Sequence, residues 1–213
     1  AMGPSSGGTW GMLSAKQMAP GAQAIFGIVP SAAFNVVGGD IARFVTAPSP
    51  VTAVVDVYVI NPDGGHGILA KGFKYVDPAT LGPAPQIASM DPSEGPTKGG
   101  HKSVIIGTGM SAQAWAFFDT TPAVTTKVVD NGASTITPPH GLGAVDVAVT
   151  NAAGRTTLAK GAYTYVPPPQ VDQVDPGAGP SAGGTFVTIT GKHFKLAKDG
   201  GKGAKIVFCT SFE

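Results

Sequence analysis

An internal repeat constrains the fold of this chain more than any other feature of its sequence. The stretch "GPTKGGHKSVIIGTG" (95–109) returns as "GPSAGGTFVTITGKHF" (179–194) and, more faintly, as "GPSSGGTWGMLSAKQM" (3–18). Two further markers recur in the same order: "AVVDVYVINPDG" (53–64) with "GAVDVAVTNAAG" (143–154), and "AKGFKYV" (70–76) with "AKGAYTYV" (159–166). Markers that recur in a fixed order indicate repeated modules.

The repeat predicts three modules. They cover residues 1–77, which lack the leading strand; residues 85–166; and residues 168–213, which are incomplete at the C-terminal end. The proline-rich linkers "DPATLGPAP" and "VPPPQ" are predicted to be extended and semi-rigid. The third module would expose an apolar surface at Val187, Ile189, Ile206 and Phe208. We therefore expect either a longer natural polypeptide with further repeats or another chain that adds the missing strands.

The glycine-rich stretch 95–109 comes within one inserted residue of the G-x-x-x-x-G-K-[ST] loop that binds phosphate. A phosphate loop needs a strand before it and a helix after it, whereas the β-branched run "SVIIG" follows here. The Gly-Pro-x-x-Gly-Gly frame persists in all three copies, but Lys102 and Ser103 become Phe186 and Val187 in the third. We interpret the glycines as structural, permitting a bulge or a close strand crossing before a strand.

Composition and alternation indicate an all-β protein. Charged residues make up only 13% of the chain, which has 31 glycines and 19 prolines, a balance typical of short strands joined by turns. In "VDVAVT", Val145, Val147 and Val149 share one face and predict a core on that side. About seven strands per module describe an immunoglobulin-like sandwich. The repeat aligns Val57 with Val147 and Tyr75 with Tyr165 as core positions.

The prolines that precede the last hairpins have an expected role in solubility. Pro48, Pro50, Pro138 and Pro139 would deny an N–H to any strand that sought to pair there. We predict that they protect the strand edges against association.

The second module resembles an IPT/TIG domain, the immunoglobulin-like module of plexins, Rel-type transcription factors and many bacterial surface and secreted proteins. The matching features are Pro92, the pairs Gly95-Pro96 and Gly99-Gly100, Gly107, Phe118 to Pro122, Pro138-Pro139 and Tyr163-x-Tyr165. The first and third modules match in part, and Cys209 stands where the first module has Gly27. The resemblance implies tandem IPT/TIG-type β-sandwiches of a bacterial or phage surface or secreted protein, and modules of this type are usually non-catalytic spacers or binding platforms.

No residue pattern predicts a catalytic, cofactor or metal site. His66, His101, His140 and His193 fall in different turns or strand starts without metal-ligand spacing, and no nucleophile frame accompanies the serines. Nothing near Cys209 would lower the pKa of a reactive thiol. The one candidate interaction loop is the most charged stretch, with Lys192, His193, Lys195, Lys198, Lys202 and Lys205.

Three hypotheses for function follow. The leading one is a non-catalytic structural and interaction protein, a rigid array that meets other chains or further repeats on a cell surface, an extracellular filament or a virus particle. A carbohydrate-binding or spacer segment of a secreted enzyme is the second, but it needs a row of exposed aromatic residues, and Trp10 and Trp115 are the only tryptophans. A nucleic-acid-binding module that uses residues 192–205 is the third, disfavoured because the net charge is +1. No apolar run reaches the roughly 18 residues of a membrane span, so membrane insertion is not expected.

Overall fold

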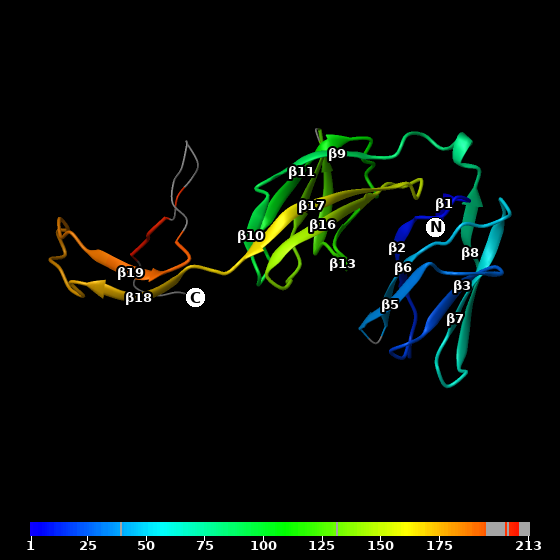
Figure 1. The fold of residues 1–213 in the computed structure, drawn as a ribbon, viewed down its shortest axis with the longest axis horizontal. Helices are drawn as coiled ribbons and strands as arrows, with labels where there is room; N and C mark the ends of the chain where they lie inside the picture. The colour runs from blue at the N-terminus through cyan, green and yellow to red at the C-terminus, as the bar shows by residue number, and fades with distance from the viewer. Residues whose placement is uncertain (39, 131, 195–202, 204, 209–213) are drawn as a thin grey trace. The chain divides into compact units, whose positions relative to one another are not determined.

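The computed structural model describes residues 1–38, 40–130, 132–194, 203 and 205–208 (Figure 1). The chain divides into two compact units, Ala1–Tyr165 and Val166–Glu213, and each is described by itself. The described residues form β-strands and one short 3₁₀ helix, η1 (Pro78–Thr80). None of their helices is long and apolar enough to cross a membrane. The predicted all-β class is confirmed.

Residues 1–76 form the first sandwich. Its five-stranded sheet has the order β1 (Met2–Pro4), β8 (His66–Val76), β7 (Val54–Ile60), β3 (Gln23–Phe26), β4 (Val29–Pro30). Its three-stranded sheet has the order β2 (Trp10–Ser14), β6 (Ile41–Val45), β5 (Ala33–Gly38). Buried aromatic rings join the two sheets: Phe44 of β6 lies 5.0 Å from Phe26 of β3, which lies 5.2 Å from Phe73 of β8. Burying one such ring stabilises the fold by about 1.5–3 kcal/mol.

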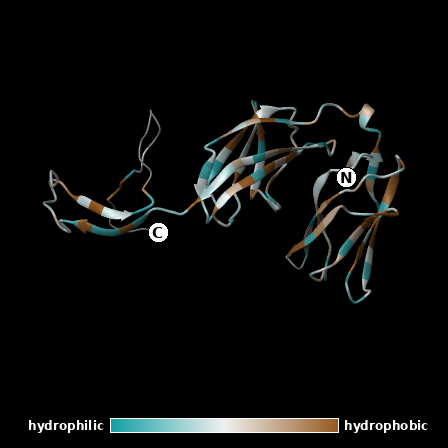
Figure 2. Ribbon diagram, viewed as in Figure 1, coloured by the Kyte–Doolittle hydropathy of each residue, from teal (hydrophilic) through white to brown (hydrophobic). Residues whose placement is uncertain are grey.

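Residues 86–165 form the second sandwich. Its five-stranded sheet has the order β10 (Glu94–Pro96), β17 (Thr156–Val166), β16 (Gly143–Thr150), β12 (Trp115–Phe118), β13 (Thr121–Pro122). Its four-stranded sheet has the order β14 (Thr125–Val129), β15 (Gly132–Ile136), β11 (Lys102–Thr108), β9 (Gln86–Asp91). Hydrophobic and hydrophilic residues alternate along several of these strands (Figure 2). The core contains Ile105, Phe118, Val147, Tyr163 and Tyr165.

The two sandwiches superimpose in register. Phe26 pairs with Val57 in the first, and Phe118 pairs with Val147 in the second. Both valines are buried, as are Tyr75 and Tyr165 at the ends of β8 and β17, which confirms the alignment derived from the repeat. Among the described residues, no strand in the first sandwich pairs with β2 in the way that β9 pairs with β11 in the second.

The glycine frame forms the same turn in all three copies. The N–H groups of Gly7, Gly99 and Gly183 donate to the carbonyls of Pro4, Pro96 and Pro180 at 3.0, 2.9 and 2.9 Å. Each of these glycines and the glycine that follows it have φ between +68° and +88°, a conformation that residues with a Cβ rarely adopt. A Cβ on Gly99 would lie 2.5 Å from the carbonyl carbon of Pro138. The glycines form a tight turn that comes close to the Pro138 backbone, in place of the expected bulge or close strand crossing.

The C-terminal unit contains one hairpin-like pair among its described residues. Strand β18 (Gln170–Asp175) pairs antiparallel with β19 (Thr188–Lys192). Val187 and Ile189 are partly exposed, while Ile206 and Phe208 are 61% and 72% exposed. Cys209 lies outside the described residues.

Candidate functional site

The outer face of the second sandwich, meaning the face of its five-stranded sheet that is turned away from the core, is buried in part. Phe117 alternates with the core residues Ala116 and Phe118 and therefore points outward, yet it is 0% exposed. Ala148 and Thr150, on the same face of β16, are 0% and 3% exposed. Val145, Val147 and Val149 face the core, as "VDVAVT" predicted. Ala148 and Thr150 on the opposite face are buried as well.

Residues at the start of β2 cover this face, within the compact unit 1–165. The hydroxyl of Thr9 donates to the Gly154 carbonyl at 2.7 Å, and the Trp10 N–H donates to the hydroxyl of Thr156 at 3.2 Å. The rings of Trp10 and Phe117 meet at 62° with centroids 5.6 Å apart. Such edge contacts contribute about 0.5–1.5 kcal/mol beyond area burial. We call Thr9, Trp10, Phe117, Gly154 and Thr156 the joint.

Gly154 allows the backbone of the first sandwich to come close. Its φ is +74°, and an added Cβ would lie 2.0 Å from the Met2 carbonyl oxygen. Gly64 occupies the equivalent turn of the first sandwich with φ +87°, and an added Cβ there would meet nothing within 4 Å. The same turn is thus covered in one sandwich and open in the other.

Both tryptophans line one cavity beside the joint. The cavity has a volume of about 190 Å³, and its lining includes Trp10, Trp115, Gln113 and Asn151. Trp115 is 49% exposed, so part of its ring is accessible. A second, smaller cavity of about 90 Å³ lies beside Trp10, Phe117 and Arg43, and burial lowers the pKa of Arg43 from its ordinary value.

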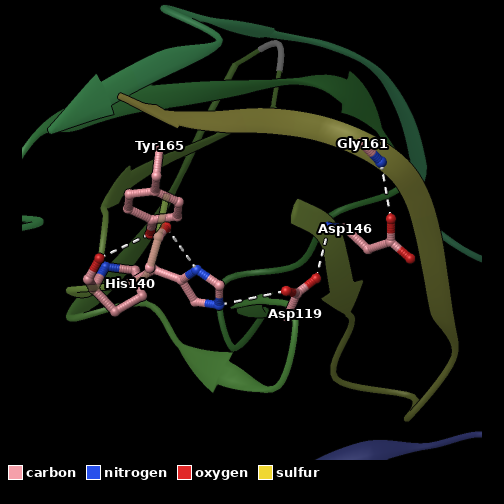
Figure 3. A network of polar contacts seen from close by, with 7 residues as sticks. Asp119, His140, Asp146, Gly161 and Tyr165 are labelled. Carbon is pink, nitrogen blue, oxygen red and sulfur yellow. Dashed lines mark hydrogen bonds and ion pairs between the residues drawn. The ribbon is translucent and has the colours of Figure 1, made fainter. Parts of the chain in front are cut away.

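A polar network crosses the other end of the second sandwich (Figure 3). Asp119 accepts the Asp146 N–H at 2.8 Å and faces His140 Nε2 at 3.4 Å, while Asp146 accepts the Gly161 N–H at 2.8 Å. The His140 ring stacks on Tyr165, whose hydroxyl donates to the Pro138 carbonyl at 2.8 Å. Burial raises the pKa of Tyr165 well above its usual range, and Tyr163 and Asp119 raise it further. The carboxylates of this network bind backbone N–H groups, so we assign it a structural role.

The first sandwich has half of this network. Asp56 accepts the Lys71 N–H at 2.7 Å, as Asp146 accepts that of Gly161. Gly27 stands in place of Asp119, and both residues have positive φ, +68° and +49°. Both sandwiches therefore share the aspartate that accepts a backbone N–H, and only the second adds the contact between Asp119 and His140.

The structure describes only part of the predicted interaction loop, which stays a prediction. Lys192, His193 and Lys205 are exposed, while Lys195, Lys198 and Lys202 lie outside the described residues. The described residues contain no group of three or more His, Cys, Asp or Glu that could hold a metal ion. Sequence reasoning missed the joint, although adjacent Phe117 and Phe118 on one strand were a usable signal, because only one of two neighbours can face the core.

Fold and joint together define a tandem array of immunoglobulin-like sandwiches. The family model of the IPT/TIG domain matches residues 85–165 and 169–212, more than half of the chain. The chain belongs to the IPT/TIG domain family, as the sequence motifs indicated. A comparison with curated protein sequences found no significant match.

Several solved structures are similar to this chain. The plexin A4 full extracellular region matches with 16% identity and a TM-score of 0.42, covering 90% of this chain and 17% of that one. SGBP-B from a complex xyloglucan utilization locus in Bacteroides uniformis matches with 16% identity and a TM-score of 0.33, covering 76% and 46%. SGBP-B of the Bacteroides ovatus mixed-linkage glucan utilization locus, in complex with a heptasaccharide, matches with 10% identity and a TM-score of 0.33, covering 79% and 44%. This chain spans less than half of each of those chains.

Proposed function

We propose that this chain is a non-catalytic structural and interaction protein whose immunoglobulin-like modules dock on one another to form a rigid array. We place the array outside the cell, on a cell surface, in a filament or on a virus particle. The resemblance to the modules of plexins and bacterial secreted proteins supports an extracellular place in general. The burial of Phe117 is the observation that carries the proposal. Trp10 of the first sandwich packs against this outward-facing ring, and apolar patches on an outer face are typical of interaction sites.

The linker between the sandwiches supports the same function. Arg155 donates to the Pro78 carbonyl at 3.2 Å, and Thr157 donates to the Pro85 carbonyl. The side chain of Asn151 donates to the Pro83 carbonyl at 3.4 Å. These bonds hold residues 77–85 along the second sandwich, so the linker adds restraint to that of the joint.

Distances between spin labels on the two sandwiches test this function. Labels at Lys16→Cys and Lys127→Cys, both exposed positions, in a Cys209→Ser background should give a narrow distance distribution. Trp10→Ala should broaden it, because the ring contact with Phe117 is lost. Leu142→Ala, at a 67% exposed position outside the joint, is the matched control and should leave it narrow. A wild-type distribution as broad as that of Trp10→Ala would contradict the array.

A second candidate function, carbohydrate binding, rests on the cavity beside the joint. Indole faces suit the apolar faces of a sugar ring, and amides such as that of Gln113 suit its hydroxyls. Its volume of about 190 Å³ favours a single sugar unit at the end of a glycan. A saccharide array followed by a tryptophan fluorescence titration should find binding that Trp115→Ala removes while the label distances stay narrow. Absence of any response up to about 10 mM sugar would mean a binding free energy weaker than about −3 kcal/mol. That result would rule out carbohydrate binding.

A further inference from the structure

The outer face of the first sandwich reproduces the covered face of the second. Cross-strand pairing places Ile25, Tyr58 and Ile68 in one row across β3, β7 and β8. Their counterparts in the second sandwich are Phe117, Ala148 and Leu158, paired in the same way across β12, β16 and β17. The first sandwich therefore presents an apolar row at the position where the second receives Trp10.

The two faces differ at two positions of this row, because Phe117 and Ala148 are fully buried whereas Ile25 and Tyr58 are partly exposed. The third position of the row is exposed in both sandwiches, at 57% for Ile68 and 42% for Leu158, and Ile60 is also partly exposed. A Cβ added at Gly64 would meet no atom within 4 Å, whereas the equivalent space beside Gly154 holds the Met2 backbone. We call Ile25, Tyr58, Ile60, Gly64 and Ile68 the open face.

The C-terminal unit contains a second example of the segment that covers such a face. Residues 183–186 read Gly-Gly-Thr-Phe, where residues 7–10 read Gly-Gly-Thr-Trp. Both segments have two glycines with φ between +77° and +88°. A Cβ on Gly179 would lie 2.5 Å from the Thr185 hydroxyl, and one on Gly3 would lie 2.0 Å from the Thr9 hydroxyl. The two threonines therefore sit alike in their turns.

The aromatic residue of this segment, Phe186, is almost fully exposed to solvent. Phe186 is 97% exposed, the highest exposure among the large hydrophobic residues described. The second sandwich has His101 and Lys102 at the corresponding positions, and the His101 ring lies 3.4 Å from the Tyr163 hydroxyl of its own sandwich. The described part of the chain thus holds one unused covering segment and one open face.

We propose that Thr185 and Phe186 of one copy of this chain dock on the open face of a second copy. The proposal rests on the proposed function, because it extends the same joint from one chain to two. Phe186 covers the row of Ile25 and Tyr58, and the Thr185 hydroxyl donates to the Gly64 carbonyl, as Thr9 donates to that of Gly154. The contact joins two different surfaces, so copies add head to tail without closing into a symmetric dimer.

Sedimentation velocity of the full chain over a concentration series up to about 1 mM tests the proposal, since small interfaces reach only weak affinity. We expect concentration-dependent growth beyond the dimer. Phe186→Ala should weaken it at least about tenfold, as expected for a residue at the centre of a contact. Ile68→Asp should weaken it as well, because it places a charge beside Tyr58 in the row that Phe186 covers. Phe208→Ala and Val124→Asp, at positions 72% and 63% exposed, are matched controls and should associate like the parent.

Mixing the two variants gives a sharper result. Phe186→Ala keeps its open face and Ile68→Asp keeps its covering segment, so an equimolar mixture forms one intact contact per pair. We expect the mixture to form dimers that grow no further. Two isologous surfaces could not give this result, because each variant would then carry one damaged side of the same patch.

Three outcomes would overturn the proposal: a parent chain that stays monomeric across the series, association that Ile68→Asp leaves intact, or a mixture that forms no dimer. Association that survives Ile68→Asp but is lost in Phe208→Ala would point to pairing between C-terminal units. A monomeric chain whose spin-label distances remain narrow would remove this inference and leave the proposed function standing. Broad spin-label distances in a chain that self-associates would contradict the proposed rigid array and leave the association between copies standing.

Discussion

The two sandwiches share one sheet architecture, yet the surroundings of their outer faces differ. Phe117 is fully buried, whereas Ile25, its counterpart in the strand register, is partly exposed. The same holds for Gly154 and Gly64, which occupy equivalent turns with and without a neighbour against them. Comparison of the two faces shows that a strand's sequence determines which residues face outward, and the adjoining module determines whether those residues meet water.

The largest difference between the faces should appear when their central residues are truncated. Phe117→Ala should lower the free energy of unfolding of the second sandwich by about 3 kcal/mol, because it leaves a cavity beneath Trp10. Ile25→Ala should lower that of the first sandwich by about 1 kcal/mol, because its side chain is already partly in water. Denaturant titrations monitored by fluorescence and by circular dichroism measure both. Equal losses would contradict the assignment of one face as covered and the other as open.

A smaller difference should separate the two turn glycines. Both have positive φ, so alanine at either position costs about 1 kcal/mol of backbone strain. Gly154→Ala should lose about 2 kcal/mol or more, because its Cβ also displaces the Met2 backbone from the joint. Gly64→Ala is the matched control. If the two variants unfolded at the same denaturant concentration relative to their parent sandwich, the close approach at Gly154 would be wrong.

Removing the equivalent carboxylates of Asp56 and Asp146 should destabilise the two sandwiches equally. This tests whether the sandwiches differ mainly in the exposure of their outer faces. Asp56→Ala and Asp146→Ala each remove an acceptor for a backbone N–H, with bonds of 2.7 and 2.8 Å. We expect each to cost about 1–2 kcal/mol in its own sandwich, the range for hydrogen bonds to a charged group. A clearly larger loss in one sandwich would show that the two differ inside their sheets and that face exposure is not their main difference.

The smallest effect on stability at neutral pH is expected from the buried tyrosines of β8 and β17. Burial raises the pKa of Tyr75, Tyr163 and Tyr165 above the value of about 10 for an unfolded chain. The folded state therefore keeps these protons when the unfolded state releases them, so stability is complete below about pH 10 and falls as pH rises through the folded pKa values. Unfolding titrations at about pH 8, 10 and 11 should show this fall, and Tyr165→Phe should reduce it. A stability that stays flat to about pH 11 would contradict the prediction.

Much of the fold was predictable from the repeat. Because equivalent positions in two modules meet the same surroundings inside a sandwich, aligning Val57 with Val147 and Tyr75 with Tyr165 located core residues in both. The glycine frame was correctly separated from a phosphate loop, since a β-branched run follows it and the lysine changes between copies. Its geometry was less predictable, because a bulge and a tight turn place the same demand on glycine.

Adjacent Phe117 and Phe118 indicate a covered outer face, but the sequence does not identify the segment that covers it. Alternation places Ala148 and Thr150 on the face away from the core, where small and polar residues are ordinary for a surface exposed to water. Nothing in one strand states that Thr9 and Trp10, far away in the sequence, will lie against it. The charges of residues 192–205, in contrast, are evident from the sequence. Only Lys192, His193 and Lys205 of that predicted set lie in the described residues.

The parallel pairing of β1 with β8 has a mechanical consequence. Met2, Gly3 and Pro4 pair with Lys74, Tyr75 and Val76, so the beginning and the end of the first sandwich lie side by side. The Lys74 backbone N–H donates to the Ala1 carbonyl at 3.0 Å, and the Ser5 backbone N–H donates to the Val76 carbonyl at 2.8 Å. A pull that separates the two ends along the strands would stretch these bonds together instead of opening them one at a time. A module tethered in this way resists tension in the direction in which a string of modules is pulled.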